Sequence, residues 1–163
     1  MSLEIDLILR LTAAAVMGGL IGLEREYRSK EAGFRTNFLV ALGSALFMIL
    51  SAHGFDGVIG SDFAIAHDNN FRLDVSRIAA QVVTGIGFIG AGTIILRKNM
   101  VRGLTTAACV WVVAAIGLAC GAGMYLLAGF STVLVLIGLE AFNFLLRRMK
   151  RKQYPDEEDQ TKE

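Results

Sequence analysis

The sequence predicts an all-α polytopic membrane protein with five transmembrane helices. Of its 163 residues, 54% are hydrophobic, and these residues gather in runs long enough to cross a bilayer. A hydrocarbon core about 30 Å thick needs roughly 20 apolar residues per helix. Within that core every backbone N–H and C=O must be paired internally, which favours helices over irregular segments. Basic residues also concentrate in alternate connections, as expected for a chain that crosses the membrane repeatedly.

Five apolar runs separated by polar connections are the expected spans. They are Leu3–Leu23, Thr36–His53, Ser76–Leu96, Leu104–Cys120 and Met124–Leu146. The first run has neither a preceding basic region nor a cleavage motif, so we expect it to be a retained span rather than a signal peptide. Residues 1–146 therefore form the predicted membrane domain. Residues 147–163 form a basic and then acidic tail, which is too polar to bury a core and is expected to be flexible.

The distribution of lysine and arginine predicts the orientation. Thirteen of the sixteen basic residues lie in 24–37, 97–103 and 147–163, which fall on one side of a five-span chain. Cytoplasmic connections carry the excess of basic residues in membrane proteins. The sequence therefore predicts an N-terminus outside the cell membrane and a C-terminus in the cytoplasm.

The third run carries four glycines, at positions 85, 87, 90 and 92. On a helical wheel Gly85 and Gly92 share a face with Gln81, whereas Gly87 and Gly90 lie roughly opposite. Bare backbone allows a close approach by neighbouring helices, so we expect a central helix packed tightly on two sides. A bulkier strip between these faces is expected to meet lipid or a looser contact: Val82, Ile86 and Ile89. The alternative is a broken helix whose unwound backbone lines a binding site.

Charged residues near the outer ends of the first and third spans allow two arrangements. Asp74 and Arg77 open the third span, where an acidic residue caps free N–H groups and a basic residue one turn later pairs with it. Arg10 lies inside the first span and either extends to the near interface or pairs with a carboxylate. The candidate carboxylates on that side are Asp74, Asp6 and Glu4.

A second group of charged residues lies around the inner ends of the first two spans. It comprises Glu24, Arg25, Glu26 and Arg35, with Glu140 and Asn143 of the fifth span at the same level. We interpret this group as an ion-pair collar, with a docking face for another membrane protein as the functional alternative. Gln81 and Thr84 are expected to form interhelical hydrogen bonds near the glycines. Thr105 and Thr106 are expected to cap the fourth span.

The sequence favours neither catalysis nor a resident cofactor. The outer loop holds Asp56, Asp62, Asp68 and Asp74, with His53 and His67, but carboxylates six residues apart on a flexible loop make a poor preformed cation cage. We therefore assign no metal site. No nucleophile–base, phosphate-loop or zinc motif occurs, so no catalytic residue is assigned. The basic tail is a feature of topology and of anionic lipid rather than of nucleic-acid binding.

Four segments together resemble the MgtC/SapB family of bacterial inner-membrane proteins. They are Gly19-Leu-Ile-Gly-Leu-Glu-Arg-Glu26, Ala32-Gly-Phe-Arg-Thr36, Asp74-x-x-Arg-Ile-Ala-Ala-Gln-Val-Val-Thr-Gly-Ile-Gly-Phe-Ile-Gly-Ala-Gly92 and Gly103-Leu-Thr-Thr-Ala-Ala108. The resemblance implies a multi-pass, five-span domain with a cytoplasmic C-terminus. Longer members carry a C-terminal soluble domain of the ACT type. This chain ends near the fifth span, which fits either a short member or part of a longer one.

The resemblance also implies a function that composition does not supply. Virulence-associated members are regulators that adapt the cell to low magnesium or acid by acting on other membrane proteins, notably the rotary ATP synthase. The implied functional residues are Glu24, Arg25, Arg35, Thr36, Asp74, Arg77 and Gln81, with Gly85, Gly87, Gly90 and Gly92 for helix packing. The alternative is a magnesium or other cation transporter or channel. Expected partners are the lipid bilayer, other integral membrane proteins and a second copy in a homodimer.

Overall fold

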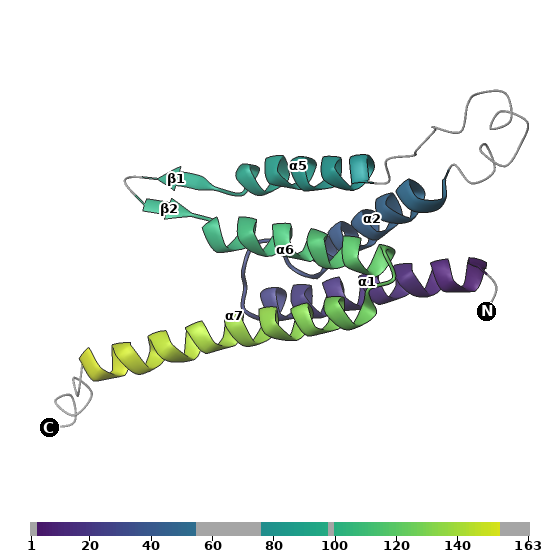
Figure 1. Ribbon diagram of the computed structural model, residues 1–163. Helices are drawn as coiled ribbons and strands as arrows, with labels where there is room; N and C mark the ends of the chain where they lie inside the picture. Colours follow the sequence, from purple (N-terminus) through teal and green to yellow (C-terminus); the bar gives the residue numbers. More distant parts are fainter. Residues whose placement is uncertain (1–2, 55–75, 98–99, 154–163) are drawn as a thin grey trace, which may run out of the picture.

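A computed structural model of the chain describes residues 3–54, 76–97 and 100–153, and they form an all-helical bundle with one short hairpin (Figure 1). The elements are α1 (Leu3–Tyr27), α2 (Phe34–His53), α5 (Ser76–Gly92), β1 (Ile95–Arg97), β2 (Met100–Arg102), α6 (Leu104–Gly121) and α7 (Tyr125–Gln153). Successive helices run in alternating directions in Figure 1. The α1–α2 connector and the hairpin therefore lie at one end of the bundle, which we call the connector end.

Small residues hold α2 at the centre, between α1 and α6. On the α1 side, a Cβ atom added to Gly18 would lie 2.4 Å from the Ala41 Cβ, and one added to Gly22 would lie 2.7 Å from the Phe34 Cα. On the α6 side, a Cβ added to Gly117 would lie 2.3 Å from the Ala41 carbonyl oxygen. Real Cβ atoms cannot approach so closely, so both neighbours meet α2 through bare backbone. The sequence placed the central helix at 76–96, and the structure corrects this to α2.

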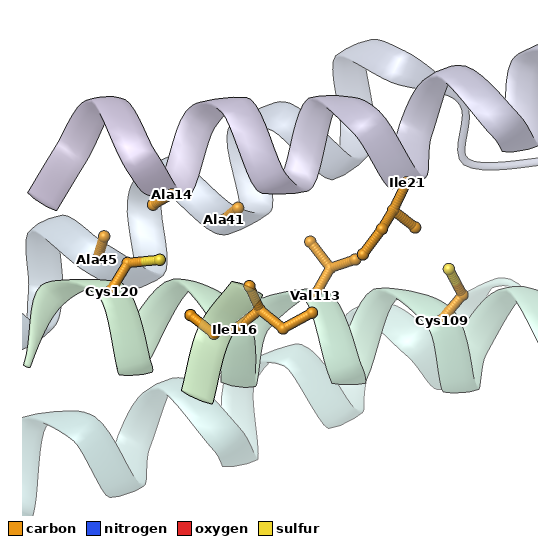
Figure 2. Close-up of a cluster of buried hydrophobic side chains, with 9 residues drawn as sticks. Ala14, Ile21, Ala41, Ala45, Cys109, Val113, Ile116 and Cys120 are labelled. Carbon is orange, nitrogen blue, oxygen red and sulfur yellow. The ribbon is translucent and has the colours of Figure 1, made fainter. Parts of the chain in front are cut away.

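The main core lies where α1, α2 and α6 meet. Figure 2 shows Ala14 of α1, Ala41 and Ala45 of α2, and Cys120 of α6 turned toward the same space. All four are fully buried. Small side chains at the crossing let the helix axes approach, and Ile21, Val113 and Ile116 fill the wider space beside it. Cys109 and Cys120 are both free thiols, one near each end of α6.

Helix α5 lies at the edge of the bundle, and one of its faces is packed. Ile86 is buried against Val110 and Ala114 of α6, and a Cβ added to Gly90 would lie 3.4 Å from the Ala107 carbonyl oxygen. The strip of Val82, Ile86 and Ile89 was expected to meet lipid or a looser contact. The structure corrects this at Ile86, which lies in the packed face, and at Val82, which packs beside it. The helix is continuous over its 17 residues, so the broken-helix alternative is wrong.

The third span ends earlier than the sequence predicted, because a β-hairpin follows it. The Thr93 N–H and hydroxyl both donate to the Gly90 carbonyl, at 3.0 and 2.7 Å, which closes the last turn of α5. Strands β1 and β2 then pair antiparallel, with Leu96 opposite Val101. Gly103 joins the hairpin to α6 with φ = 89°. Its bare Cα is required there, since a Cβ would lie 2.0 Å from the Thr93 carbonyl oxygen.

Among the described residues, three helices, α1, α2 and α6, are long and apolar enough to cross a membrane by length and composition. Two shorter apolar segments, Arg77–Gly92 and Tyr125–Ala141, accompany them. Helix α7 continues to Gln153, so the basic stretch 147–152, which the sequence placed in a flexible tail, is helical. Asp74 and the rest of the acidic loop beyond Gly54 lie outside the described residues.

Packing around α2 predicts opposite responses at two glycines. We expect Gly117→Ala to lower the free energy of unfolding by about 1–3 kcal/mol, because the new methyl group overlaps the α2 backbone. Gly43→Ala is the matched control, because nothing lies within 4 Å of its added Cβ. Its stability should stay within about 1 kcal/mol of the wild type, since alanine also favours the helix. Unfolding by denaturing detergent, followed by circular dichroism, measures both, and equal losses would contradict the packing.

Candidate functional site

Arg25 is a buried cation at the connector end of the bundle. It lies in the last turn of α1, where the helix dipole favours positive charge, and the residue is only 4% exposed. Its Nη2 donates to the Thr106 Oγ1 of α6 at 2.8 Å and to the Glu31 carbonyl of the connector at 3.4 Å. Among the described residues no carboxylate lies within ion-pair distance of it. Arg25 therefore joins α1, α6 and the connector through neutral acceptors.

Glu24 heads a separate ionic chain that reaches α7. Its Oε1 accepts from the Arg28 Nε at 3.1 Å, and Arg28 also pairs with Glu140. The hydrogen bond that Arg28 donates to the Glu140 carboxylate raises the pKa of Arg28 above its ordinary value. The predicted ion-pair collar is therefore present in part, since it contains Glu24 and Glu140 but neither Arg25 nor Arg35.

The connector between α1 and α2 is held by two further side chains. The Glu26 Oε2 accepts from the Phe34 N–H at 2.8 Å and so caps α2 from α1. Asn37 is fully buried, and its Nδ2 donates to the Ala32 and Gly33 carbonyls at 2.5 and 3.0 Å. These bonds fix the turn in which Ser29 and Ala32 adopt positive φ angles of 52° and 55°.

Three buried polar atoms in this cluster have no hydrogen-bond partner among the described residues. They are the Glu24 Oε2, the Arg25 Nε and the Asn37 Oδ1. Buried polar atoms are nearly always paired, and unpaired ones mark places where a small polar group or water completes a network. The cluster thus combines the Arg25 guanidinium, which has no ion-pair partner among the described residues, with the Glu24 carboxylate, of which one oxygen is hydrogen-bonded and the other is not.

At the opposite end Arg10 pairs within its own helix and also crosses to α6. Its Nη2 lies 2.6 Å from the Asp6 Oδ2. Its Nη1 donates to the Gly121 carbonyl at 3.0 Å, which satisfies the last turn of α6. The Tyr125 hydroxyl lies 3.5 Å from the other Asp6 oxygen. Of the carboxylates proposed for Arg10, the structure brings Asp6 to it, whereas Asp74 lies outside the described residues.

The remaining predicted site residues do not converge. Arg35, Thr36, Arg77 and Gln81 are all exposed, the first two at the start of α2 and the others on α5. Of the four glycines, Gly90 contacts a neighbour, and nothing within the described chain lies within 4 Å of Cβ atoms added to Gly85, Gly87 and Gly92. The packing role of those three glycines stays a prediction.

Thr106 and Asn37 are site residues that sequence reasoning missed or misassigned. Thr106 was expected to cap the fourth span, but the N-cap of α6 is Gly103 and no side chain caps it. Thr106 instead receives the hydrogen bond of Arg25. Thr106 lies three residues after Gly103, a position typical of the first turn of a helix. Nothing in the sequence near Thr106 indicates that Arg25 is its hydrogen-bond partner. The described residues contain no group of three or more His, Cys, Asp or Glu that could hold a metal ion.

The Arg25–Thr106 hydrogen bond predicts unequal effects of two neighbouring substitutions. Thr106→Val keeps the side-chain shape but leaves a buried guanidinium short of an acceptor, which should cost about 1–3 kcal/mol of unfolding free energy. Thr105→Val removes an exposed hydroxyl and should change it by no more than about 0.5 kcal/mol. Detergent-induced unfolding compares the two, and a larger loss for Thr105→Val would contradict the assignment.

Curated proteins from several bacteria match this chain over most of its length. It is 50% identical to the Escherichia coli (strain K12) protein named "Putative magnesium transporter YhiD" over 149 residues, which are 91% of this chain and 66% of that protein. It is 43% identical to "Protein MgtC" of Brucella abortus (strain 2308) over 84% of this chain and 50% of that protein. The chain thus spans between half and about two thirds of the length of these relatives.

The family profile agrees with these relatives and covers nearly the whole bundle. No solved structure matches the chain. The sequence profile of the MgtC family matches residues 11–148, a range that runs from α1 into α7 and includes both buried clusters. The chain therefore belongs to the MgtC family.

Proposed function

We propose that this protein is a non-enzymatic regulator in the bacterial inner membrane, which acts through helix–helix contacts with another integral membrane protein. Its helices span the membrane five times, with the N-terminus outside and the C-terminus in the cytoplasm. The alternating helix directions in Figure 1 support this topology. The basic connection 24–37, the hairpin arginines Arg97 and Arg102 and the basic end of α7 all fall at the connector end, which is then cytoplasmic.

The observation that carries the proposal is the bare outward face of α5. Ala80, Thr84, Gly87 and Ala91 recur at intervals of about one helical turn, and all four are exposed. The Thr84 hydroxyl is turned back to the Ala80 carbonyl at 3.3 Å, so it presents no free donor to a partner. Small residues at this spacing allow a second helix to approach closely in a membrane. Helices α1, α2 and α6 use such contacts within the bundle, whereas α5 leaves its contact face open.

The middle of the bundle favours regulation over transport. At the level of Ala14, Ala41 and Cys120, the main core is closed by fully buried side chains. The charged clusters lie at the two ends and are separated by this apolar layer, since Arg10 contacts Gly121 whereas Arg25 contacts Thr106. A cation crossing among the described residues would meet few oxygen ligands, such as the buried hydroxyls of Ser44 and Thr132, to replace its hydration shell.

The partner proposed from the family resemblance is the rotary ATP synthase, in cells adapting to low magnesium or acid. The name of the relative YhiD points instead to magnesium transport, which makes a cation carrier the second candidate. Because this chain spans only part of its relatives, the activity of the longer proteins is itself a proposal for this one.

Filling the outward face of α5 should release the partner without unfolding the bundle. In inverted membrane vesicles we expect the wild-type protein to lower ATP-driven proton pumping, and Gly87→Ile to restore it. The larger side chain separates the two helix backbones, while the space beside Gly87 within the chain is open. Gly138→Ile on α7 is the matched control, because nothing lies within 4 Å of its added Cβ either.

The Gly138→Ile control distinguishes loss of the contact between α5 and its partner from loss of folded protein in the membrane. Both variants should accumulate in the membrane and unfold in detergent as the wild type does, and Gly138→Ile should still lower proton pumping. Equal inhibition by all three proteins would remove the α5 face from the proposal. The absence of inhibition by the wild type would refute the ATP synthase as the partner.

Magnesium transport is tested separately in liposomes. The purified wild-type protein should give no magnesium influx above that of protein-free vesicles, measured with an enclosed magnesium-sensitive dye under an imposed gradient. The closed apolar layer of the bundle is the physical reason. Influx that depends on the protein and is abolished by Asp74→Asn would favour the carrier over the regulator.

A further inference from the structure

A groove between α2 and α5 lies on a different side of α5 from the bare outward face. Its volume is about 580 Å³, which falls within the range of about 300–1,000 Å³ typical of small-molecule sites. Its lining is almost wholly apolar and comes from Leu39, Val40, Gly43, Ser44 and Phe47 of α2 and Ile78, Gln81, Val82, Gly85, Ile86, Phe88 and Ile89 of α5. An apolar groove in a bilayer does not stay empty, because its lining would lose dispersion contacts.

The shape of the groove suits a narrow, flexible chain better than another helix. Close helix pairing needs small residues on both surfaces. Here the side chains along the groove include Leu39, Phe47 and Phe88, which are large and 63%, 51% and 83% exposed. Between them Gly43 and Gly85 leave open space, since nothing lies within 4 Å of an added Cβ at either position.

Arg35 places positive charge at the connector end of this groove. On α2 the lining residues form a stripe, and Thr36 and Arg35 continue it one turn before Val40 and Leu39. Arg35 is exposed, and its guanidinium has no ion-pair or hydrogen-bond partner in the described parts of the chain. The first turn of α2 holds no acidic residue, so the helix dipole adds to the positive potential. Glu26 neutralises part of it from α1 through the Phe34 N–H.

We propose that this groove binds one anionic phospholipid, with an acyl chain along the α2–α5 groove and the phosphate at Arg35 and Thr36. Arginine presents a planar fork of donors to phosphate oxygens, and a neighbouring hydroxyl adds a donor. Under the proposed topology this end lies at the cytoplasmic leaflet, where anionic lipid is met. The proposed lipid site gives Arg35, Thr36 and Gly85 a role. The contacts inside the bundle do not explain these three residues.

Lipid retention by the purified protein tests the site independently of any protein partner. The full chain is extracted in mild detergent, offered dioleoyl phosphatidylglycerol or dioleoyl phosphatidylcholine, and analysed by native mass spectrometry. We expect one phosphatidylglycerol per chain, retained at least fivefold more strongly than phosphatidylcholine. Gly85→Leu fills the groove and should reduce retention at least tenfold, whereas Gly87→Leu on the opposite side of α5 should retain the lipid.

The headgroup contact is tested by two arginines at opposite ends. Arg35→Gln should weaken phosphatidylglycerol retention about five- to tenfold, as expected for the loss of one charge-assisted contact. Arg77→Gln carries the same charge change at the far end of the groove and should change retention less than twofold. Equal retention of the two lipids, or equal retention by Gly85→Leu and Gly87→Leu, would overturn the proposal. The proposal would also be overturned if Gly85→Leu displaced a co-purifying protein while phosphatidylglycerol stayed bound.

Discussion

The close approach of α2 to both of its neighbours is the constraint on which the rest of the structure depends. Gly18 and Gly22 of α1 meet one side of α2, and Gly117 and Gly121 of α6 meet the other. In lipid the apolar side chains gain little by leaving the solvent, so association rests on dispersion contact and geometric fit. Two glycine pairs that approach the backbone of α2 from opposite sides supply that fit. Helix α5 then packs on α6, where Ile86 meets Val110 and Ala114, and it also lies against α2.

The same close contact explains where the polar groups are found. A tightly packed apolar layer leaves no space for charge at mid-depth, so Arg10 and Arg25 lie toward opposite ends of α1 and bond to opposite ends of α6. Each arginine also satisfies a neutral acceptor on that helix. Charge at the ends therefore fixes the register of α1 against α6, while the small residues set the distance of each of these helices from α2.

The sequence predicted the helices well because long apolar runs in lipid have one dominant solution. The sequence prediction failed where an element is very short or where two contacting residues lie far apart in the chain. The hairpin has three residues per strand, too few to distinguish Ile94–Leu96 from a continuing apolar helix. The Arg25–Thr106 pair joins residues 81 positions apart. No local pattern marks such a partner, so Thr106 was assigned to the nearest helix end instead.

The glycines of α5 show why counting small residues does not locate a helix within a bundle. A glycine in the sequence indicates that the helix backbone is bare on one side. It does not indicate whether the same chain, lipid or a partner covers that side. In α6 the glycines are filled by α2, and in α5 three of four have nothing beside them in the described chain. Glycine weakens a helix in water by about 1 kcal/mol relative to alanine. Under the two proposals made above, lipid covers Gly85 on the groove side of α5 and a second helix covers Gly87 on the outward side.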